Sequence, residues 1–241
     1  MKSITVYARK TVAAELIRWL GTTGAAEITQ VVVASEEEAV TSAARHVGAR
    51  VLSWSQRQEI EPTDLAVSLL FPMRLRADQL TLARLGAINF HPAPLPDYRG
   101  VGGYNIAILE GLTQWAVTAH YMTETIDAGP IIDVEWFSFD SMSATVASLM
   151  AQSNGVLGAQ AKRVIQAAIE AEGQLPTIPN EGGRYVDRKE LEAMKRIEPG
   201  DDVARKVRAF WFPPYRGAYV EIDGGAYTLV DDELLRGYDP T

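Results

Sequence analysis

Residues 28–48 read ITQVVVASEEEAVTSAARHVG and decide the fold class. Ile28–Val33 consists mostly of β-branched residues, which favours a buried strand. Ser35 and Glu38 have capping-box spacing before an alanine-rich helix, which we expect to end just before Gly48. A strand followed directly by a helix is the repeating unit of α/β folds, and one such unit predicts others along the chain.

The same alternation continues on both sides of this unit. Apolar runs predict strands at residues 4–7, 51–54, 65–71 and 87–90, and apolar spacings of three and four predict helices at 12–20 and 76–85. Strands that alternate with crossover helices form parallel sheets. We therefore predict an α/β fold, a Rossmann-like and mainly parallel sheet with helices on both faces.

The second half of the chain has longer elements. It predicts a short helix at 104–109, strands at 115–123 and 131–139, and an amphipathic helix at 143–172. Residues 173–183 are rich in proline and glycine, and we place a boundary there between a core, 1–172, and a C-terminal region, 173–241. That region predicts helices at 188–197 and 203–210 and a β-hairpin whose turn is Asp223-Gly224-Gly225.

Composition excludes several classes of protein. The 241 residues are 47% hydrophobic and 22% charged, which is ordinary for a globular protein and excludes a disordered chain. A formal net charge of −8 excludes a broad cationic surface for nucleic acid. Cysteine is absent, so thiol nucleophiles and disulfides are excluded. No apolar run is long enough to span a bilayer, and we expect a cytoplasmic protein.

The predicted hairpin carries more apolar surface than a lone hairpin can bury. Its apolar residues are Tyr219, Val220, Ile222, Tyr227 and Leu229. Apolar surface of this kind marks an interface. We expect the C-terminal region to form a homodimer contact or to close over the substrate.

His91 is the strongest candidate for chemistry. It follows the strand at 87–90 directly and opens a loop with three prolines, at the carboxyl end of a parallel strand, where α/β sheets bind ligands. Asn89 lies two residues earlier, so both side chains point to the same side of the strand. Asp127, in the connection 124–130, joins them if the strand at 115–123 ends on the same edge.

Asn, His and Asp without a serine or cysteine nucleophile indicate direct acyl transfer to an amine. The imidazole can accept the amine proton, the carboxylate can orient the imidazole, and the amide NH₂ can stabilise an oxyanion. No cluster has zinc-ligand spacing, and we expect no metal. His46, near a helix end, and His120, a hydrogen-bonded histidine in or beside the sheet, have structural interpretations.

Two motifs carry a resemblance to a known family. LGAINFHPAPLPDYRG (85–100) and MTETIDAGPII (122–132) resemble the signature of the formyltransferases that use 10-formyltetrahydrofolate. The resemblance is clear over 65–139 and extends in overall pattern over 1–172. It implies formyl transfer, with the family's catalytic Asn, His and Asp at Asn89, His91 and Asp127, the residues already selected.

The resemblance also bears on the substrate. Tyr7–Thr11 lacks the glycine-rich loop of glycinamide ribonucleotide formyltransferases. Methionyl-tRNA formyltransferases have a basic linker and a carboxyl-terminal barrel, whereas we expect two helices and a hairpin in the acidic residues 173–241. Formyltetrahydrofolate hydrolases usually add an amino-terminal regulatory domain, and we expect none before Ile4. The chain looks most like the sugar N-formyltransferases, whose acceptor is a nucleotide-linked amino sugar. A formyltransferase acting on an amino acid, peptidyl or methionyl-tRNA amine, and a silent folate- or nucleotide-binding homologue, stay as alternatives.

The resemblance implies binding residues as well. For the folate these are Phe71, Met73, Leu75, Ile88, Glu124 and Ile126. For the acceptor they are Arg9, Lys10, Tyr98, Arg99, Tyr104, Asn105 and Tyr215. Leu75 can equally be a core residue, and the cations Arg9, Lys10 and Arg99 can equally be solvated surface. The sequence leaves open the base, the sugar, and whether the product enters a surface polysaccharide or an antibiotic.

Overall fold

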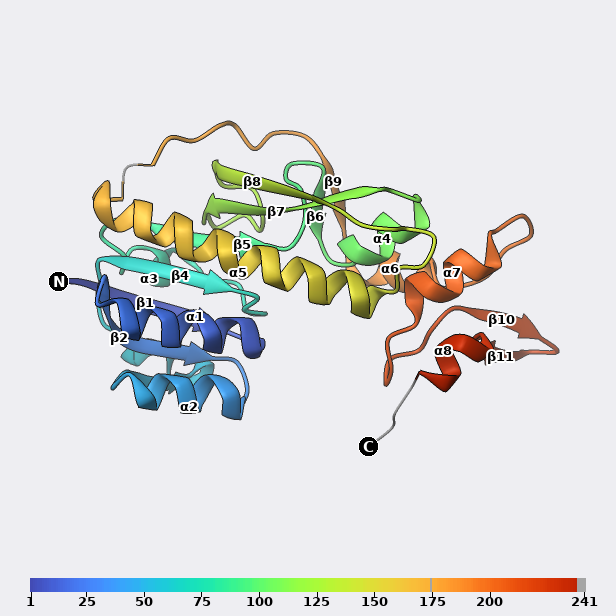
Figure 1. Ribbon diagram of the computed structural model, residues 1–241, viewed down its shortest axis with the longest axis horizontal. Helices are drawn as coiled ribbons and strands as arrows, with labels where there is room; N and C mark the ends of the chain where they lie inside the picture. The colour runs from blue at the N-terminus through green and yellow to red at the C-terminus, as the bar shows by residue number, and fades with distance from the viewer. Residues whose placement is uncertain (174, 238–241) are drawn as a thin grey trace.

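The computed structural model describes residues 1–173 and 175–237, and its centre is a seven-stranded sheet (Figure 1). The strands, in their order across the sheet, are β3 (Arg50–Ser53), β2 (Ala26–Val33), β1 (Lys2–Ala8), β4 (Leu65–Leu69), β5 (Ala87–His91), β7 (Gln114–Tyr121) and β8 (Ile131–Ser138). Neighbours from β3 to β5 are parallel, whereas β7 is antiparallel to both β5 and β8. The prediction of a mainly parallel α/β sheet is confirmed.

Helices cover both faces of this sheet, but unequally. The long helices α1 (Lys10–Thr23), α2 (Glu38–His46) and α5 (Val146–Glu170) pack on one face, in front of the sheet in Figure 1. On the opposite face, the helices of the described residues that pack there are the 3₁₀ helix η1 (Trp54–Glu59) and the single-turn α3 (Ala77–Leu80). The thinly covered face leaves room for a site at the strand ends.

Side-chain alternation along β5 separates core from site. Ile88 and Phe90 point into the core beneath the long helices and are almost fully buried. Ala87 packs on the opposite face, and the period of two places Asn89 and His91 on that same side. The strand thus presents an amide and an imidazole away from its own hydrophobic core.

Two predicted helix boundaries are wrong. The helix expected over 76–85 ends at Leu80, because the next residues pair with a neighbouring loop: Thr63 N–H donates to Leu82 O, and Arg84 N–H donates to Thr63 O. Ser35 does not cap α2, which begins at Glu38 after Glu37. The Glu37 carboxylate instead accepts a hydrogen bond from the Lys10 backbone at the start of α1 (2.6 Å).

The C-terminal region packs on the core through a second hydrophobic cluster. The C-terminal region contains β9 (Arg184–Val186), α6 (Arg188–Ala193), α7 (Val203–Phe210), the hairpin β10 (Tyr219–Ile222) and β11 (Gly225–Thr228), and α8 (Asp232–Arg236). Val207 and Phe210 of α7 share this cluster with the fully buried Trp115 of β7. The cluster also includes residues of α4 (Gly103–Leu109). In addition, β9 pairs in parallel with β6 (Tyr98–Gly100), inside the proline loop.

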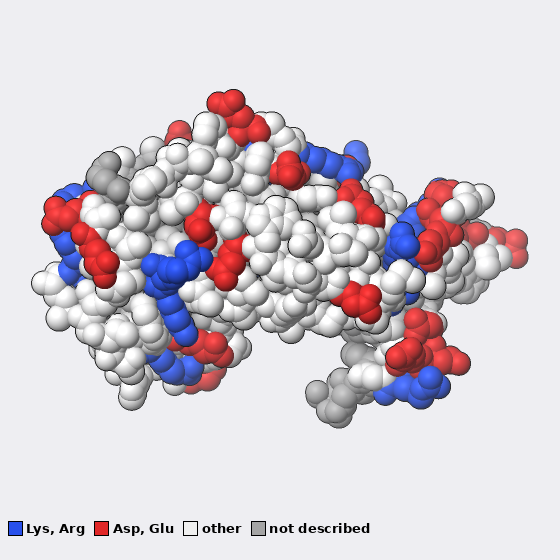
Figure 2. Space-filling model, turned by 45° about the horizontal axis from the view of Figure 1, so that its top comes forward, with Lys and Arg blue, Asp and Glu red and all other residues white. Residues whose placement is uncertain are grey.

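The face of the molecule shown in Figure 2 carries charged side chains of both signs. Basic side chains are interspersed with acidic ones on the face shown in Figure 2. Within the described part of the chain, no helix combines the length and the hydropathy that a membrane span requires.

Candidate active site

Asn89, His91 and Asp127 meet at the carboxyl end of β5. His91 and Asp127 are both buried, and His91 Nδ1 lies 3.4 Å from Asp127 Oδ1. Asn89 projects from the same side of β5 as His91. The three side chains selected from the sequence therefore come together.

Asp127 reaches His91 by a route that the sequence did not indicate. In the register of β5 and β7, Tyr121 lies opposite Ile88, so β7 ends at the amino end of β5 and the expectation of a shared strand edge is wrong. The connection between β7 and β8 brings Asp127 back to His91. There its Oδ2 accepts a hydrogen bond from the Gly100 backbone (3.1 Å), which ties this connection to the proline loop.

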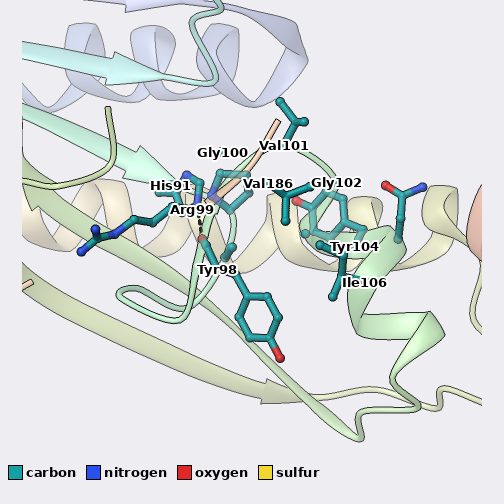
Figure 3. Close-up of a pocket in the computed structure, with 13 residues that line it drawn as sticks. His91, Tyr98, Arg99, Gly100, Val101, Gly102, Tyr104, Ile106 and Val186 are labelled. Carbon is teal, nitrogen blue, oxygen red and sulfur yellow. Dashed lines mark hydrogen bonds between the residues drawn. The ribbon is translucent and has the colours of Figure 1, made fainter. Parts of the chain in front are cut away.

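Both nitrogens of the His91 ring face oxygen acceptors. Nε2 lies 2.9 Å from the Tyr98 carbonyl, as the dashed line in Figure 3 shows, and Nδ1 faces Asp127. A neutral imidazole has one N–H and can satisfy only one of these acceptors, whereas a protonated ring satisfies both. The two oxygens therefore leave one acceptor without a hydrogen from His91 whenever the ring is neutral.

His120 orients the amide of Asn89. Its Nδ1 lies 2.8 Å from the Tyr121 carbonyl, which can only accept, so Nδ1 carries the hydrogen. Its Nε2 then accepts from Asn89 Nδ2 at 3.1 Å. The interpretation of His120 as a hydrogen-bonded histidine in the sheet is confirmed, but its contact with Asn89 was missed. No sequence signal indicates this contact, because it depends on the strand register that places His120 opposite Asn89.

Burial, and to a lesser extent the neighbouring His91, lowers the pKa of His120 to about 4. An unfolded histidine titrates near pH ~6.5, so between pH 6.5 and 4 only the unfolded state takes up this proton. The free energy of unfolding should therefore fall with decreasing pH, by up to about 1.4 kcal/mol per pH unit from this group. Thermal melts of wild type and His120→Gln from pH 4 to 7.5 measure this. Equal pH slopes in the two proteins would contradict the assignment.

Two pockets open on either side of His91 and its partners. Pocket A is lined by Asn89 and Asp127 together with Phe71, Met73, Leu75 and Ile126. Pocket B is lined by His91 and by residues of the proline loop and α4, including Tyr98, Arg99, Tyr104 and Asn105 (Figure 3). Burial raises the pKa of Tyr104 to about 12, so its hydroxyl stays neutral. The polar cluster thus contributes side chains to both pockets.

A third cavity, pocket C, lies at the end of β1. It encloses about 730 Å³ and is lined by Arg9, Lys10, Glu37, Met150 of α5 and Phe212, among others. Arg9 Nε lies 3.5 Å from a Glu37 carboxylate oxygen. Burial lowers the pKa of Lys10, and the adjacent Arg9 lowers it further. The two cations predicted for the acceptor thus line one cavity.

Some predicted binding residues lie elsewhere. Ile88 is fully buried in the core because it alternates with Asn89, so its side chain does not reach pocket A, and this prediction is corrected. Glu124 accepts a hydrogen bond from Ala77 N–H at the start of α3 (3.1 Å) and does not line pocket A. Tyr215 stacks on Phe212 at 6.0 Å between ring centroids, and it lines neither pocket beside His91.

Arg99 lines pocket B but is already bonded to protein. Its Nη2 donates to the side-chain and backbone oxygens of Asn180. In Figure 3 its guanidinium points away from Tyr104.

As for metals, the described residues contain no group of three or more potential ligands that could hold an ion.

Comparison with known proteins identifies the family. A family model described as formyl transferase matches residues 17–156, more than half of the chain. The chain belongs to the formyl transferase family. Methionyl-tRNA formyltransferases of Burkholderia ambifaria and Staphylococcus aureus are 30% identical over 70% and 71% of this chain. The chain spans 51% and 55% of those relatives, about half their length.

Solved structures resemble this formyl transferase over nearly its whole length. A sugar N-formyltransferase from a Shewanella species superposes with a TM-score of 0.76 at 17% identity, covering 95% of this chain and 96% of that one. An N-formyltransferase from Helicobacter canadensis, solved with folinic acid and dTDP-3-aminofucose, gives a TM-score of 0.72 at 18% identity, covering 93% and 85%. At this identity the likeness shows the fold. Asn89, His91 and Asp127 all lie inside the segment that the family model matches.

Proposed function

We propose that this formyl transferase moves the formyl group of 10-formyltetrahydrofolate to the amine of a nucleotide-linked amino sugar. The observation that carries the proposal is the position of Asn89, His91 and Asp127 between pockets A and B. A donor held in one pocket and an amine held in the other would meet at these side chains. Positioning of this kind is a large part of catalysis in group transfer.

Pocket A suits the folate. Phe71, Met73 and Ile126 offer apolar surface for the flat pterin ring, while Asn89 and Asp127 add polar atoms beside it. The Helicobacter protein was solved with folinic acid, a formylated folate, which supports the same class of donor here.

The chain's residues can carry each proton of the reaction. The neutral amine nitrogen attacks the formyl carbon, a C–N bond forms, and the amine proton passes to His91 Nε2, which must first leave the Tyr98 carbonyl. Asn89 Nδ2 has one hydrogen engaged by His120, which leaves its second hydrogen for the oxyanion. Collapse of the tetrahedral intermediate breaks the bond from carbon to N10, and His91 gives the proton that it accepted to N10 as tetrahydrofolate leaves. Asp127 holds the charged imidazole meanwhile.

Pockets B and C suit the acceptor. Tyr98, Tyr104 and Asn105 surround the space beside His91 where the sugar amine would lie. Arg9 and Lys10 supply cations in pocket C, where a diphosphate would take over the Lys10 backbone N–H that Glu37 now occupies. The dTDP-linked amino sugar in the Helicobacter structure supports this class of acceptor.

Methionyl-tRNA is the second candidate acceptor, because the curated relatives carry that activity in their names. The net charge of −8 argues against it, since binding a polyanion requires a cationic surface.

An acceptor panel tests the proposal. UDP-, GDP-, TDP- and CMP-linked amino sugars, free amino acids and methionyl-tRNA are each incubated with 10-formyltetrahydrofolate, and formylated product is measured by mass spectrometry. One sugar nucleotide should react. It should also stabilise the fold by about 2.7 kcal/mol at 100 times its Kd. Formylation of methionyl-tRNA or an amino acid alone would reject the sugar, and no product from any amine would reject formyl transfer.

We also propose a homodimer formed through the hairpin. Ile222 and Tyr227 are 54% and 58% exposed there, and both are large apolar side chains. Sedimentation at micromolar concentration should give a dimer for wild type and a monomer for Ile222→Glu. Met142→Glu, which changes an exposed residue outside the hairpin, is the matched control and should leave the dimer intact. A monomeric wild type would refute the dimer.

A further inference from the structure

The segment between α5 and β9 is tied to the loop that carries Asp127. We call the part from residue 175 to residue 183 the strap. It runs back past β8 in Figure 1, and Ile178 exchanges two backbone hydrogen bonds with Ile131 at the start of β8. The strap lies beyond the residues that the family model matches, and the sequence marked it only as a boundary.

Asn180 is the strap residue that contacts this loop. Its side chain is buried, and Nδ2 donates to the carbonyl oxygens of Asp127 (3.0 Å) and Gly129 (2.8 Å). Its Oδ1 accepts from Arg99 Nη2 at 3.0 Å, and Arg99 also bonds the Asn180 carbonyl at 2.7 Å. Both amide hydrogens and the amide oxygen are therefore used, which fixes the orientation of the side chain.

The Asp127 loop needs an external restraint. Asp127 has φ of +52°, a left-handed conformation that costs a non-glycine residue about 1–2 kcal/mol. Such a conformation persists only where surrounding contacts determine it. The two hydrogen bonds from Asn180 fall on the carbonyls of Asp127 and Gly129, on either side of Ala128, and so hold the backbone that aims the carboxylate at His91.

We propose that Asn180, itself held by Arg99, is a positioning residue that sets the place of the Asp127 carboxylate beside His91. This rests on the proposed function, because it assigns Arg99 to the support of Asp127 within that same site. Neither residue needs to touch the reacting atoms. Their effect on the reaction passes through Asp127.

A double-mutant cycle tests this dependence. Asn180→Asp keeps the size of the side chain but removes both donors, and we expect kcat to fall about 10- to 100-fold, with both KM values within about threefold. In the Asp127→Ala background the same change should alter kcat less than about twofold, because the group that it positions is gone. An equal loss in both backgrounds would overturn the proposal.

Ile178→Ala is the matched control within the strap. The Ile178 side chain is 60% exposed and its bonds to Ile131 use only the backbone, so its kcat should match wild type. If Asn180→Asp does not fold, Arg99→Met removes the support on the other side of Asn180 and should give the same pattern. A loss in Arg99→Met that persists in the Asp127→Ala background would likewise overturn the proposal.

A second measurement, by NMR, does not require the protein to catalyse formyl transfer. The ¹⁵N chemical shift of His91 Nδ1 reports its contact with Asp127, so Asn180→Asp should move this resonance in the same direction as Asp127→Ala. If this resonance does not move, the proposed positioning role of Asn180 is wrong, even if the enzyme is active. Absence of formylation by wild type would instead reject the proposed function, while the resonance would still decide the role of Asn180.

Discussion

His91→Asn is expected to lower kcat by at least ~10²-fold, the usual scale for removing a positioned acid-base group. Asparagine is polar and similar in reach, but its amide cannot take up a proton near neutral pH. The Tyr98 carbonyl and the Asp127 carboxylate would then face a side chain that cannot become a cation between them. Steady-state formylation, measured with saturating donor and acceptor, gives the comparison.

His46→Asn is the control for this substitution. His46 is exposed in the last turn of α2, so the same chemical change there should leave kcat within about twofold of wild type. The melting temperature of each variant separates lost chemistry from lost folding. Undiminished formylation by folded His91→Asn would remove His91 from the role of general base.

The strands of the sheet were predictable because their apolar β-branched runs are local signals. The direction of β7 was not, since no residue of 115–123 encodes which way a strand pairs. The antiparallel register with β5 joins residues that lie far apart in the sequence, such as Ile88 and Tyr121, so no local pattern reports it. The wrong helix over 76–85 has the same origin, because Thr63 takes hydrogen bonds that a helix would have used.

The candidate site was likewise predictable only where its residues lie close together in the sequence. Asn89 and His91 share one strand, so a period of two was enough to bring them together. Asp127 was selected for its chemistry, but its route to His91 depends on the strap, which lies about fifty residues further along the chain. His120 and Asn180 carry no motif of their own. Their roles come from the side chains and carbonyls that the fold places beside them.

Gly129→Ala should have the second large effect, through backbone sterics and not chemistry. A β-carbon on Gly129 would lie 1.8 Å from the Tyr121 carbonyl oxygen and 2.8 Å from its carbon, so one of the two backbone segments must move. Overpacking of this kind costs roughly 1–3 kcal/mol or more of stability. Because Gly129 is two residues from Asp127, displacement of the loop should also lower kcat about 10²-fold, the loss typical of a misplacement near 1 Å.

Gly237→Ala separates this steric effect from the general cost of replacing a glycine. Gly237 has φ of −80°, and a β-carbon there would meet only backbone oxygens at 3.6 Å or more, which is ordinary contact. Its melting temperature and kcat should match wild type, whereas Gly129→Ala should lower both. Since Asn180 bonds the Gly129 carbonyl, the loop cannot move without straining that bond as well. Gly129→Ala with normal kcat would mean that the Asp127 carboxylate tolerates displacement, and its proposed hold on the charged His91 would then be wrong.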